Sequence, residues 1–95
     1  MKIAFDPAKD AINRTKHGVS LGEVARLDWD WVLAKPDTRA DYGELREIGY
    51  GPIGRRLYCV VFVDRGDTRR IISLRKANRR EIDRYEAQIG STDQG

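Results

Sequence analysis

One segment limits the possible folds of this chain more than any other: the seven residues 57–63 read Leu-Tyr-Cys-Val-Val-Phe-Val and are apolar without interruption. The segment is far too short for a membrane-spanning helix, which needs about 20 residues. It is rich in β-branched and aromatic residues, which favour strands. Because both faces of such a strand are apolar, we expect a central strand over residues 55–63, covered on both sides.

Weaker patterns predict the strands around this one. Alternating apolar residues and turn signals indicate strands over residues 31–35, 44–50 and 69–74, and a short strand at residues 1–5. The polar segment 64–67 is typical of a hairpin turn, so the strand after it is expected to return antiparallel. Residues 51–54 are expected to form the turn before the central strand.

Capping residues predict two helices near the N-terminus. Asp6-Pro7 is a typical helix start, and Gly18 is a typical residue just beyond a helix end. A second helix is expected to begin at once, because Ser20 and Glu23 have the spacing of a capping box. The two helices are expected to meet near Gly18.

A third helix is expected at the C-terminus, where Asn78 and Glu81 repeat the capping-box spacing and Gly90 is the expected end. The predicted fold is α+β: a single small domain with one antiparallel β-sheet, two N-terminal helices and one C-terminal helix. With 95 residues, the chain is expected to form one domain over residues 1–90 and a frayed tail over residues 91–95.

The charge is unevenly distributed, although the net charge is only +3. Residues 51–95 hold 10 basic and 6 acidic residues, and nine of the basic residues are arginines. Arginine suits bidentate contacts to phosphate and stacking on bases. The pattern is compatible with a partner that carries phosphate groups, such as a nucleic acid. Because acidic residues are interleaved with the arginines, a plain solvated face is an equal alternative on charge alone.

Several classes of protein are excluded or disfavoured. With one cysteine and one histidine, a zinc site of the Cys/His type is excluded, and no metal or cofactor is expected. Cys59 lies in the apolar run, so it is expected to be a small buried hydrophobe. The N-terminus lacks the pattern of a leader peptide and no apolar run could span a membrane, so a cytoplasmic protein without membrane contact is expected.

Polar residues on the expected strands are the candidates for chemistry. Ser73 and Arg75 fall on one strand face, as do Glu44 and Arg46, while Arg56 begins the central strand. A carboxylate beside an arginine on a sheet is often an ordinary ion pair. The functional alternative is a general base held beside a phosphate clamp.

Two other groups allow a structural and a functional interpretation. His17 lies at a helix end, where a cation interacts favourably with the helix dipole, but it could also transfer protons near neutral pH. Trp29 and Trp31 are two positions apart, the spacing of two side chains on the same face of a strand. This spacing favours a role in core packing over a role in stacking on bases.

An ordered set of motifs is found along nearly the whole chain. They are Lys-His-Gly-Val-Ser at residues 16–20, Gly-Glu-Leu-Arg at residues 43–46 and Ile-Ile-Ser-Leu-Arg-Lys-Ala at residues 71–77. Over about residues 5–87, this set resembles the BrnT toxins of bacterial type II toxin–antitoxin pairs. The resemblance implies a RelE-like fold and a ribonuclease that cleaves RNA without a metal and arrests translation and growth.

The resemblance also implies partners and a site. The partners would be a BrnA-like antitoxin, encoded beside the toxin, and an RNA substrate; operator DNA would be bound only through the antitoxin. The catalytic candidates carried over to matching positions are Lys16, Glu44, Arg56, Ser73 and Arg75. The candidates for RNA binding are His17, Arg46, Lys76, Arg79 and Arg80.

The expected chemistry is attack of the RNA 2′-hydroxyl on the adjacent phosphate. Glu44 or Lys16 would be the base, and His17 is the reserve acid. Arg75 and Arg56 would stabilise the phosphate charge, so Arg75→Ala is expected to abolish cleavage, with Arg69→Ala as a surface control. Two rival functions remain open: a non-catalytic nucleic-acid-binding module, and a protein-interaction module whose basic face docks an acidic partner.

Overall fold

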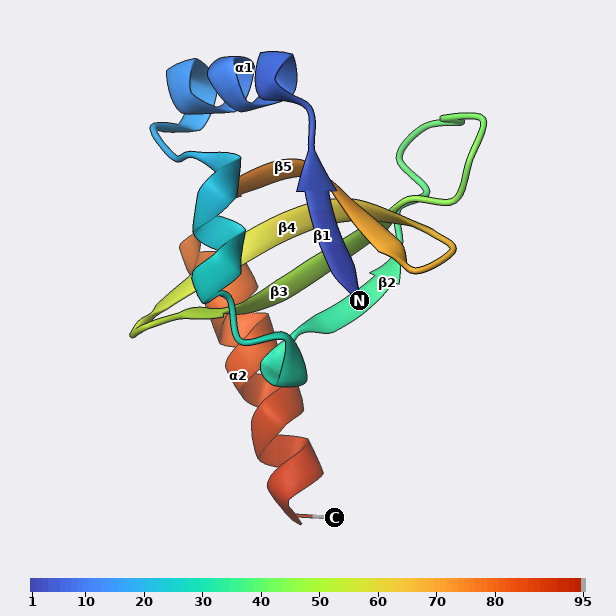
Figure 1. The fold of residues 1–95 in the computed structure, drawn as a ribbon. Helices are drawn as coiled ribbons and strands as arrows, with labels where there is room; N and C mark the ends of the chain where they lie inside the picture. Colours follow the sequence, from blue (N-terminus) through green and yellow to red (C-terminus); the bar gives the residue numbers. More distant parts are fainter. Residues whose placement is uncertain (95) are drawn as a thin grey trace.

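A computed structural model describes residues 1–94 of the chain, with side chains described for residues 1–90. Five strands form one sheet in the order β1-β5-β4-β3-β2 (Figure 1). In chain order the elements are β1 (Lys2–Phe5), α1 (Pro7–His17), the 3₁₀ helices η1 (Leu21–Arg26) and η2 (Trp29–Trp31), β2 (Leu33–Pro36), β3 (Glu47–Ile53), β4 (Arg56–Arg65), β5 (Thr68–Lys76) and α2 (Arg79–Gln94). The predicted α+β class is confirmed.

The central strand is β4, as the apolar run predicts. It is hydrogen-bonded to β3 on one side and to β5 on the other. Its residues are buried from Cys59 through Val63, and they contribute to apolar clusters on both faces of the sheet. The strand continues to Arg65, two residues beyond the predicted end, because the hairpin turn is short and centres on Gly66, whose φ is +60°.

The sheet is mixed, so the prediction of a purely antiparallel sheet is wrong. β1 pairs with β5 in the parallel sense, with Lys2 opposite Thr68 and Phe5 opposite Ile71. Both strands start at the same end of the sheet, where the Lys2 backbone N–H donates to the Asp67 carbonyl at 2.8 Å. The other strand pairs are antiparallel.

The second predicted helix is a 3₁₀ helix, not an α-helix. Ser20 is the N-cap as expected, but its hydroxyl oxygen accepts from the Gly22 N–H at 3.1 Å and not from the Glu23 N–H that the capping-box spacing predicts. Leu21, Val24 and Leu27 are all buried and recur every third residue. A helix with three residues per turn places such residues on one face, toward the core.

The two tryptophans lie outside any strand, so the strand predicted over residues 31–35 exists but begins two residues later than expected. Trp29–Trp31 form η2, capped by Asp28, and β2 begins only at Leu33. The Trp29 ring packs edge-on against Phe62, with ring centroids 5.4 Å apart. Trp31 is 49% exposed, so only Trp29 packs in the core.

The third strand begins and ends three residues later than predicted. β3 starts at Glu47 and continues through Ile53, so the turn that was expected over residues 51–54 consists of Gly54 and Arg55. Glycine is required at positions 49 and 51 because Val32, the residue just before β2, lies against this strand. A Cβ at Gly49 or Gly51 would lie 2.8 Å or 2.5 Å, respectively, from methyl carbons of Val32. The shift leaves residues 44–46 in the loop before β3.

The last helix begins as the capping pattern predicts. The Asn78 Oδ1 accepts from the Glu81 N–H, and the Glu81 Oε1 accepts from the Asn78 N–H, each at 2.9 Å. The helix then continues through Gly90 to Gln94, so its predicted end at Gly90 is wrong; glycine inside a helix costs only about 1 kcal/mol. The predicted frayed tail, residues 91–95, lies outside the residues with described side chains.

The helices lie at different places around the sheet (Figure 1). α1 contacts β5 and η1, whereas α2 leaves the end of β5 and runs past β3 and β2. Within residues 1–94, neither α-helix has the length and hydropathy that crossing a membrane requires.

Two apolar clusters lie on opposite faces of the sheet. The larger contains Val60 and Phe62 of β4 together with the buried residues of η1. The smaller contains Ile48, Cys59 and Val61, with Tyr50 and Ile72 packed against it. We call the face with the smaller cluster the site face, because the candidate residues of β5 also project from it.

Candidate functional site

Two candidate side chains of β5 project from the site face, as the sequence predicts. In the pairing of β4 with β5, Ser73 lies opposite Val61 and Arg75 lies opposite Cys59. Directly opposed residues of an antiparallel pair project to the same side of the sheet. Ser73 and Arg75 therefore share the face that carries Cys59 and Val61.

Arg75 is held by a carboxylate. Its two terminal nitrogens donate to the two oxygens of Glu81, both at 2.8 Å, in a bidentate pair. The Tyr50 hydroxyl donates to the same carboxylate at 3.2 Å, and the Asn78 N–H donates at 2.9 Å. Because Glu81 is also part of the capping box of α2, this network fixes the Arg75 guanidinium against the start of that helix.

The electrostatics of this network keep both partners ionised. The hydrogen bonds from Arg75 lower the pKa of Glu81 to about 2, and those same bonds raise the pKa of Arg75 above its usual value. Burial raises the pKa of Tyr50 to about 12, so its hydroxyl stays protonated and donates. The Arg75 side chain is 31% exposed, so part of the guanidinium still faces solvent.

Arg75 lies on the wall of a hollow of about 280 Å³. The opposite side of this hollow comes from the end of β2 and the loop after it, including Lys35 and the ion pair of Arg39 with Asp37. The Asp37 side chain is 1% exposed, and its hydrogen bonds with Arg39 lower the pKa of Asp37 to about 2. The hollow therefore has several cations in its wall, and the two carboxylates in it are already paired with arginines.

A second hollow, of about 180 Å³, lies further along β5. Ser73 from β5 and Lys16 and His17 from the end of α1 line it. Burial lowers the pKa of His17, and the positive charges of Lys16 and Arg75 lower it further. His17 thus favours the neutral form, which argues against its acting only as a cationic helix cap.

A buried asparagine holds α1 in place against β5. The Asn13 Nδ2 donates to the carbonyls of Val19 and Leu74, each at 2.8 Å, and its Oδ1 accepts from the Leu74 N–H at 3.1 Å. Leu74 lies between Ser73 and Arg75, so these bonds set the position of Lys16 and His17 relative to both residues.

The structure does not bring two of the candidate catalytic residues to this place. Glu44 accepts from Arg65 at 2.6 and 2.9 Å, at the hairpin end of β4. Arg65 is six residues beyond Cys59, the partner of Arg75, which corresponds to roughly 20 Å along the strand. Arg56 lines a different groove beside α2 and donates to the Ala77 carbonyl at 3.3 Å.

The candidates for RNA binding are also distributed. His17 is in the second hollow, whereas Arg46 lies in the loop before β3 with its guanidinium carbon 4.0 Å from the Tyr42 ring centroid. The Arg46 Nε is buried and has no hydrogen-bond partner among the described residues. The remaining three are exposed around the start of α2: Lys76, Arg79 and Arg80.

The structure also corrects the choice of Arg69 as a surface residue. Its side chain is 20% exposed and forms an ion pair with Asp64 at 2.8 Å. Its guanidinium carbon lies 4.6 Å from the Trp29 ring centroid and 4.3 Å from that of Phe62. Because Arg69 packs on the core aromatics, its removal would change stability, and it is not a neutral control.

Sequence reasoning missed the role of Glu81 beside Arg75. The capping-box spacing identified Glu81 as a helix-start residue, and that role is confirmed. Its pairing with Arg75 depends on how α2 folds back from β5, which no short pattern encodes. The contact of Tyr50 with Glu81 was missed for the same reason. The Asp37–Arg39 pair joins residues only two positions apart, but its place in the wall of the hollow depends on how the loop after β2 folds.

Two negative expectations concern other chemistry. Cys59 is buried, as predicted, and burial raises the pKa of its thiol, which disfavours the reactive thiolate. Among the described residues, no group of three or more His, Cys, Asp or Glu side chains is arranged to hold a metal ion.

The comparisons with known proteins give one positive finding. A family model described as "Ribonuclease toxin, BrnT, of type II toxin-antitoxin system" matches residues 5–81, which is most of the chain. The match contains the α1 end, β5 and Glu81. No curated protein matches the chain.

Proposed function

Because this chain belongs to the BrnT family of ribonuclease toxins of type II toxin–antitoxin systems, we propose that it cleaves RNA without a metal at the two hollows beside β5. The observation that carries the proposal is the bidentate Arg75–Glu81 pair, which presents a fixed guanidinium next to Ser73, Lys16 and His17. A planar guanidinium held in this way suits the oxygens of a phosphate.

The proposed reaction needs a base, a charge-stabilising group and an acid. Neutral His17 accepts the proton of the RNA 2′-hydroxyl as its oxygen attacks the adjacent phosphorus. Arg75 stabilises the charge of the five-coordinate phosphorane, and Ser73 donates to a phosphate oxygen. The Lys16 ammonium protonates the 5′-oxygen as the P–O5′ bond breaks, which leaves a 2′,3′-cyclic phosphate and a 5′-hydroxyl.

This assignment differs from the expected one in the choice of base. Glu44 is bound to Arg65 at the other end of the sheet, so we assign it a structural role in that loop. Arg56 lies in another groove, and we assign it to RNA contact or folding rather than to phosphate charge stabilisation. The RelE-like character of the fold remains a prediction.

The pH dependence of cleavage tests the role of His17. Because the pKa of His17 is lowered from 6.5, the neutral base persists below pH 6.5 and is lost only as the pH falls through the lowered value. We therefore expect cleavage to stay constant as the pH falls from 7 to 6.5, and to fall by about tenfold per pH unit only once the pH lies below the lowered pKa of His17. The rate of cleavage of a defined RNA measured against pH gives the profile.

His17→Gln is the matched variant for this profile. It removes the titrating group while keeping a polar side chain, so cleavage is expected to be slow at every pH and the acidic decline to disappear. An unchanged acidic decline in a folded His17→Gln protein would assign the titration to another group.

Glu81 is expected to act as a positioning residue. Glu81→Gln removes the charge that fixes Arg75 but leaves the guanidinium in place to attract RNA, so kcat is expected to fall by about 10- to 100-fold with little change in KM. Steady-state kinetics with a defined RNA measure both quantities. Asp83→Asn is the control, because Asp83 is an exposed carboxylate of the same helix whose ion pair is with Arg79 and not with Arg75.

As a toxin, the chain requires an antitoxin partner, and we propose that a BrnA-like antitoxin covers the hollows beside Arg75. An acidic segment of that partner would compete with RNA phosphate for the same cations. Translation and growth would stop only when the toxin is free.

Induced expression with and without the adjacent gene tests this function. The chain alone is expected to stop growth and fragment cellular RNA, and co-expression of the adjacent gene is expected to restore both. Cleavage by the purified chain that persists in excess chelator would support the metal-free reaction. Intact RNA and normal growth with the folded chain alone would refute it.

A further inference from the structure

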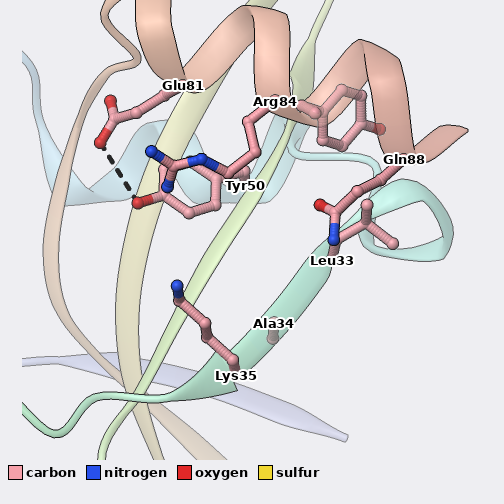
Figure 2. Close-up of a pocket in the computed structure, with 8 residues that line it drawn as sticks. Leu33, Ala34, Lys35, Tyr50, Glu81, Arg84 and Gln88 are labelled. Atoms are coloured by element: carbon pink, nitrogen blue, oxygen red, sulfur yellow. Dashed lines mark hydrogen bonds between the residues drawn. The ribbon is translucent and has the colours of Figure 1, made fainter.

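A third hollow, of about 100 Å³, lies between β2 and α2 (Figure 2). Its walls include Leu33 and Ala34 of β2 and the rings of Tyr50 and Tyr85. It shares Lys35, Tyr50 and Glu81 with the hollow that contains Arg75, so the two are adjacent parts of one groove.

Two cations extend toward this hollow from opposite elements. Figure 2 shows Lys35 from β2 and Arg84 from α2 reaching toward the space beside Tyr50. Both are exposed, and neither forms a hydrogen bond or ion pair with any described residue of the chain. By contrast, Arg75 and Arg39 in the adjacent hollow each have a carboxylate partner.

The aromatic walls are fixed in position. The Tyr50 hydroxyl donates to Glu81 at 3.2 Å, and the Tyr85 hydroxyl donates to the Trp31 carbonyl at 2.7 Å. Each ring is therefore held at its polar end while its remaining surface is half-buried in the wall. A base that stacks here would not have to order the rings first.

We propose that this hollow binds a nucleotide of single-stranded RNA next to the one whose phosphate contacts Arg75. Flat apolar walls suit a base, and two unpaired cations at the rim suit the neighbouring phosphates. An acidic peptide would satisfy the cations but would leave the aromatic surface unused, so the composition of the hollow favours RNA. The proposal rests on the proposed ribonuclease function.

Binding of a short RNA by the full chain tests this subsite. A single-stranded RNA of six nucleotides with 2′-O-methyl groups cannot be cleaved, and fluorescence anisotropy measures its affinity. Tyr85→Leu is expected to weaken binding by about tenfold because it removes one stacking surface, whereas Tyr85→Phe keeps the ring and is expected to restore most of the affinity.

The two cations provide a second readout that does not depend on the ring. Lys35→Ala and Arg84→Ala are each expected to reduce the slope of log affinity against log salt by about one. Lys2→Ala is the control, because Lys2 is an exposed cation on β1 at the other edge of the sheet. Thermal melting confirms that each variant is folded.

The outcomes separate this proposal from the proposed function. If the wild-type chain cleaves RNA and the three variants Tyr85→Leu, Lys35→Ala and Arg84→Ala also cleave it and bind it with the wild-type affinity and salt slope, the subsite alone is refuted. Failure of the wild-type chain to cleave or bind RNA would refute the proposed function and the subsite together. An oligoglutamate peptide that binds as tightly as the RNA and loses affinity in the same variants would assign the hollow to an acidic protein and overturn the proposal.

Discussion

Replacing Arg75 with alanine is expected to slow RNA cleavage by about 100- to 1,000-fold, the loss seen when one preorganised donor to a developing oxyanion is removed. Arg75 lines the hollow of about 280 Å³ on the site face, its guanidinium is held by Glu81, and Cys59 lies opposite it on β4. A guanidinium fixed before substrate arrives needs no reorganisation in the transition state. Single-turnover cleavage of a defined RNA measures the effect.

The fold is expected to survive this substitution. Without the Arg75 guanidinium, the Glu81 carboxylate still accepts from the Asn78 N–H and the Tyr50 hydroxyl, and water can reach the site. We expect a loss of about 1–2 kcal/mol in the free energy of unfolding, which chemical denaturation measures.

Two further variants make the result specific to Arg75. Arg75→Lys is also expected to be slow, because one ammonium cannot replace the planar fork that contacts both Glu81 and a phosphate. Arg26→Ala is the control, because the Arg26 side chain is 68% exposed. It lies at the end of η1, which packs on the larger apolar cluster and not on the site face. Wild-type cleavage by folded Arg75→Ala would remove Arg75 from the mechanism and leave a binding-only function for the basic residues.

Features that depend on nearby residues were predicted well from the sequence. The apolar run gave the central strand, Asp6 and Gly18 gave the ends of α1, and Asn78 with Glu81 gave the start of α2. Each of these signals is complete within a few residues of the chain, so no tertiary contact is needed to interpret it.

Features that depend on contacts between distant residues were not predicted. The parallel pairing of β1 with β5 joins segments more than sixty residues apart, and the edge where β1 lies is not encoded in its four residues. The pairing of Glu44 with Arg65 has the same origin: the loop before β3 carries Glu44 to the hairpin end of β4. The motif spacing therefore identified Ser73 and Arg75 correctly as neighbours on a face, but it could not show that Glu44 lies elsewhere.

Asn13 fixes the position of α1 and thus of the Lys-His-Gly motif at its end, so the second substitution with a large expected effect is at Asn13. Asn13→Ala is expected to lower the free energy of unfolding by about 3–5 kcal/mol, because the Val19 carbonyl and both backbone groups of Leu74 lose their hydrogen-bond partner. Asn13 is 4% exposed, so water cannot readily replace the missing bonds. For a domain of this size, such a loss is a large fraction of the total stability.

Chemical denaturation tests this expectation by comparing Asn13→Ala with the control variant Thr15→Ala. Thr15 is an exposed residue of the same helix whose hydroxyl donates to the Ala11 carbonyl within that helix, so its removal is expected to change the free energy of unfolding by less than about 0.5 kcal/mol. Under conditions where Asn13→Ala remains folded, cleavage is still expected to be impaired, because α1 no longer holds Lys16 and His17 beside Ser73. A stability within about 1 kcal/mol of the wild type, together with normal cleavage, would contradict the role of Asn13 as the residue that sets the position of α1 on β5.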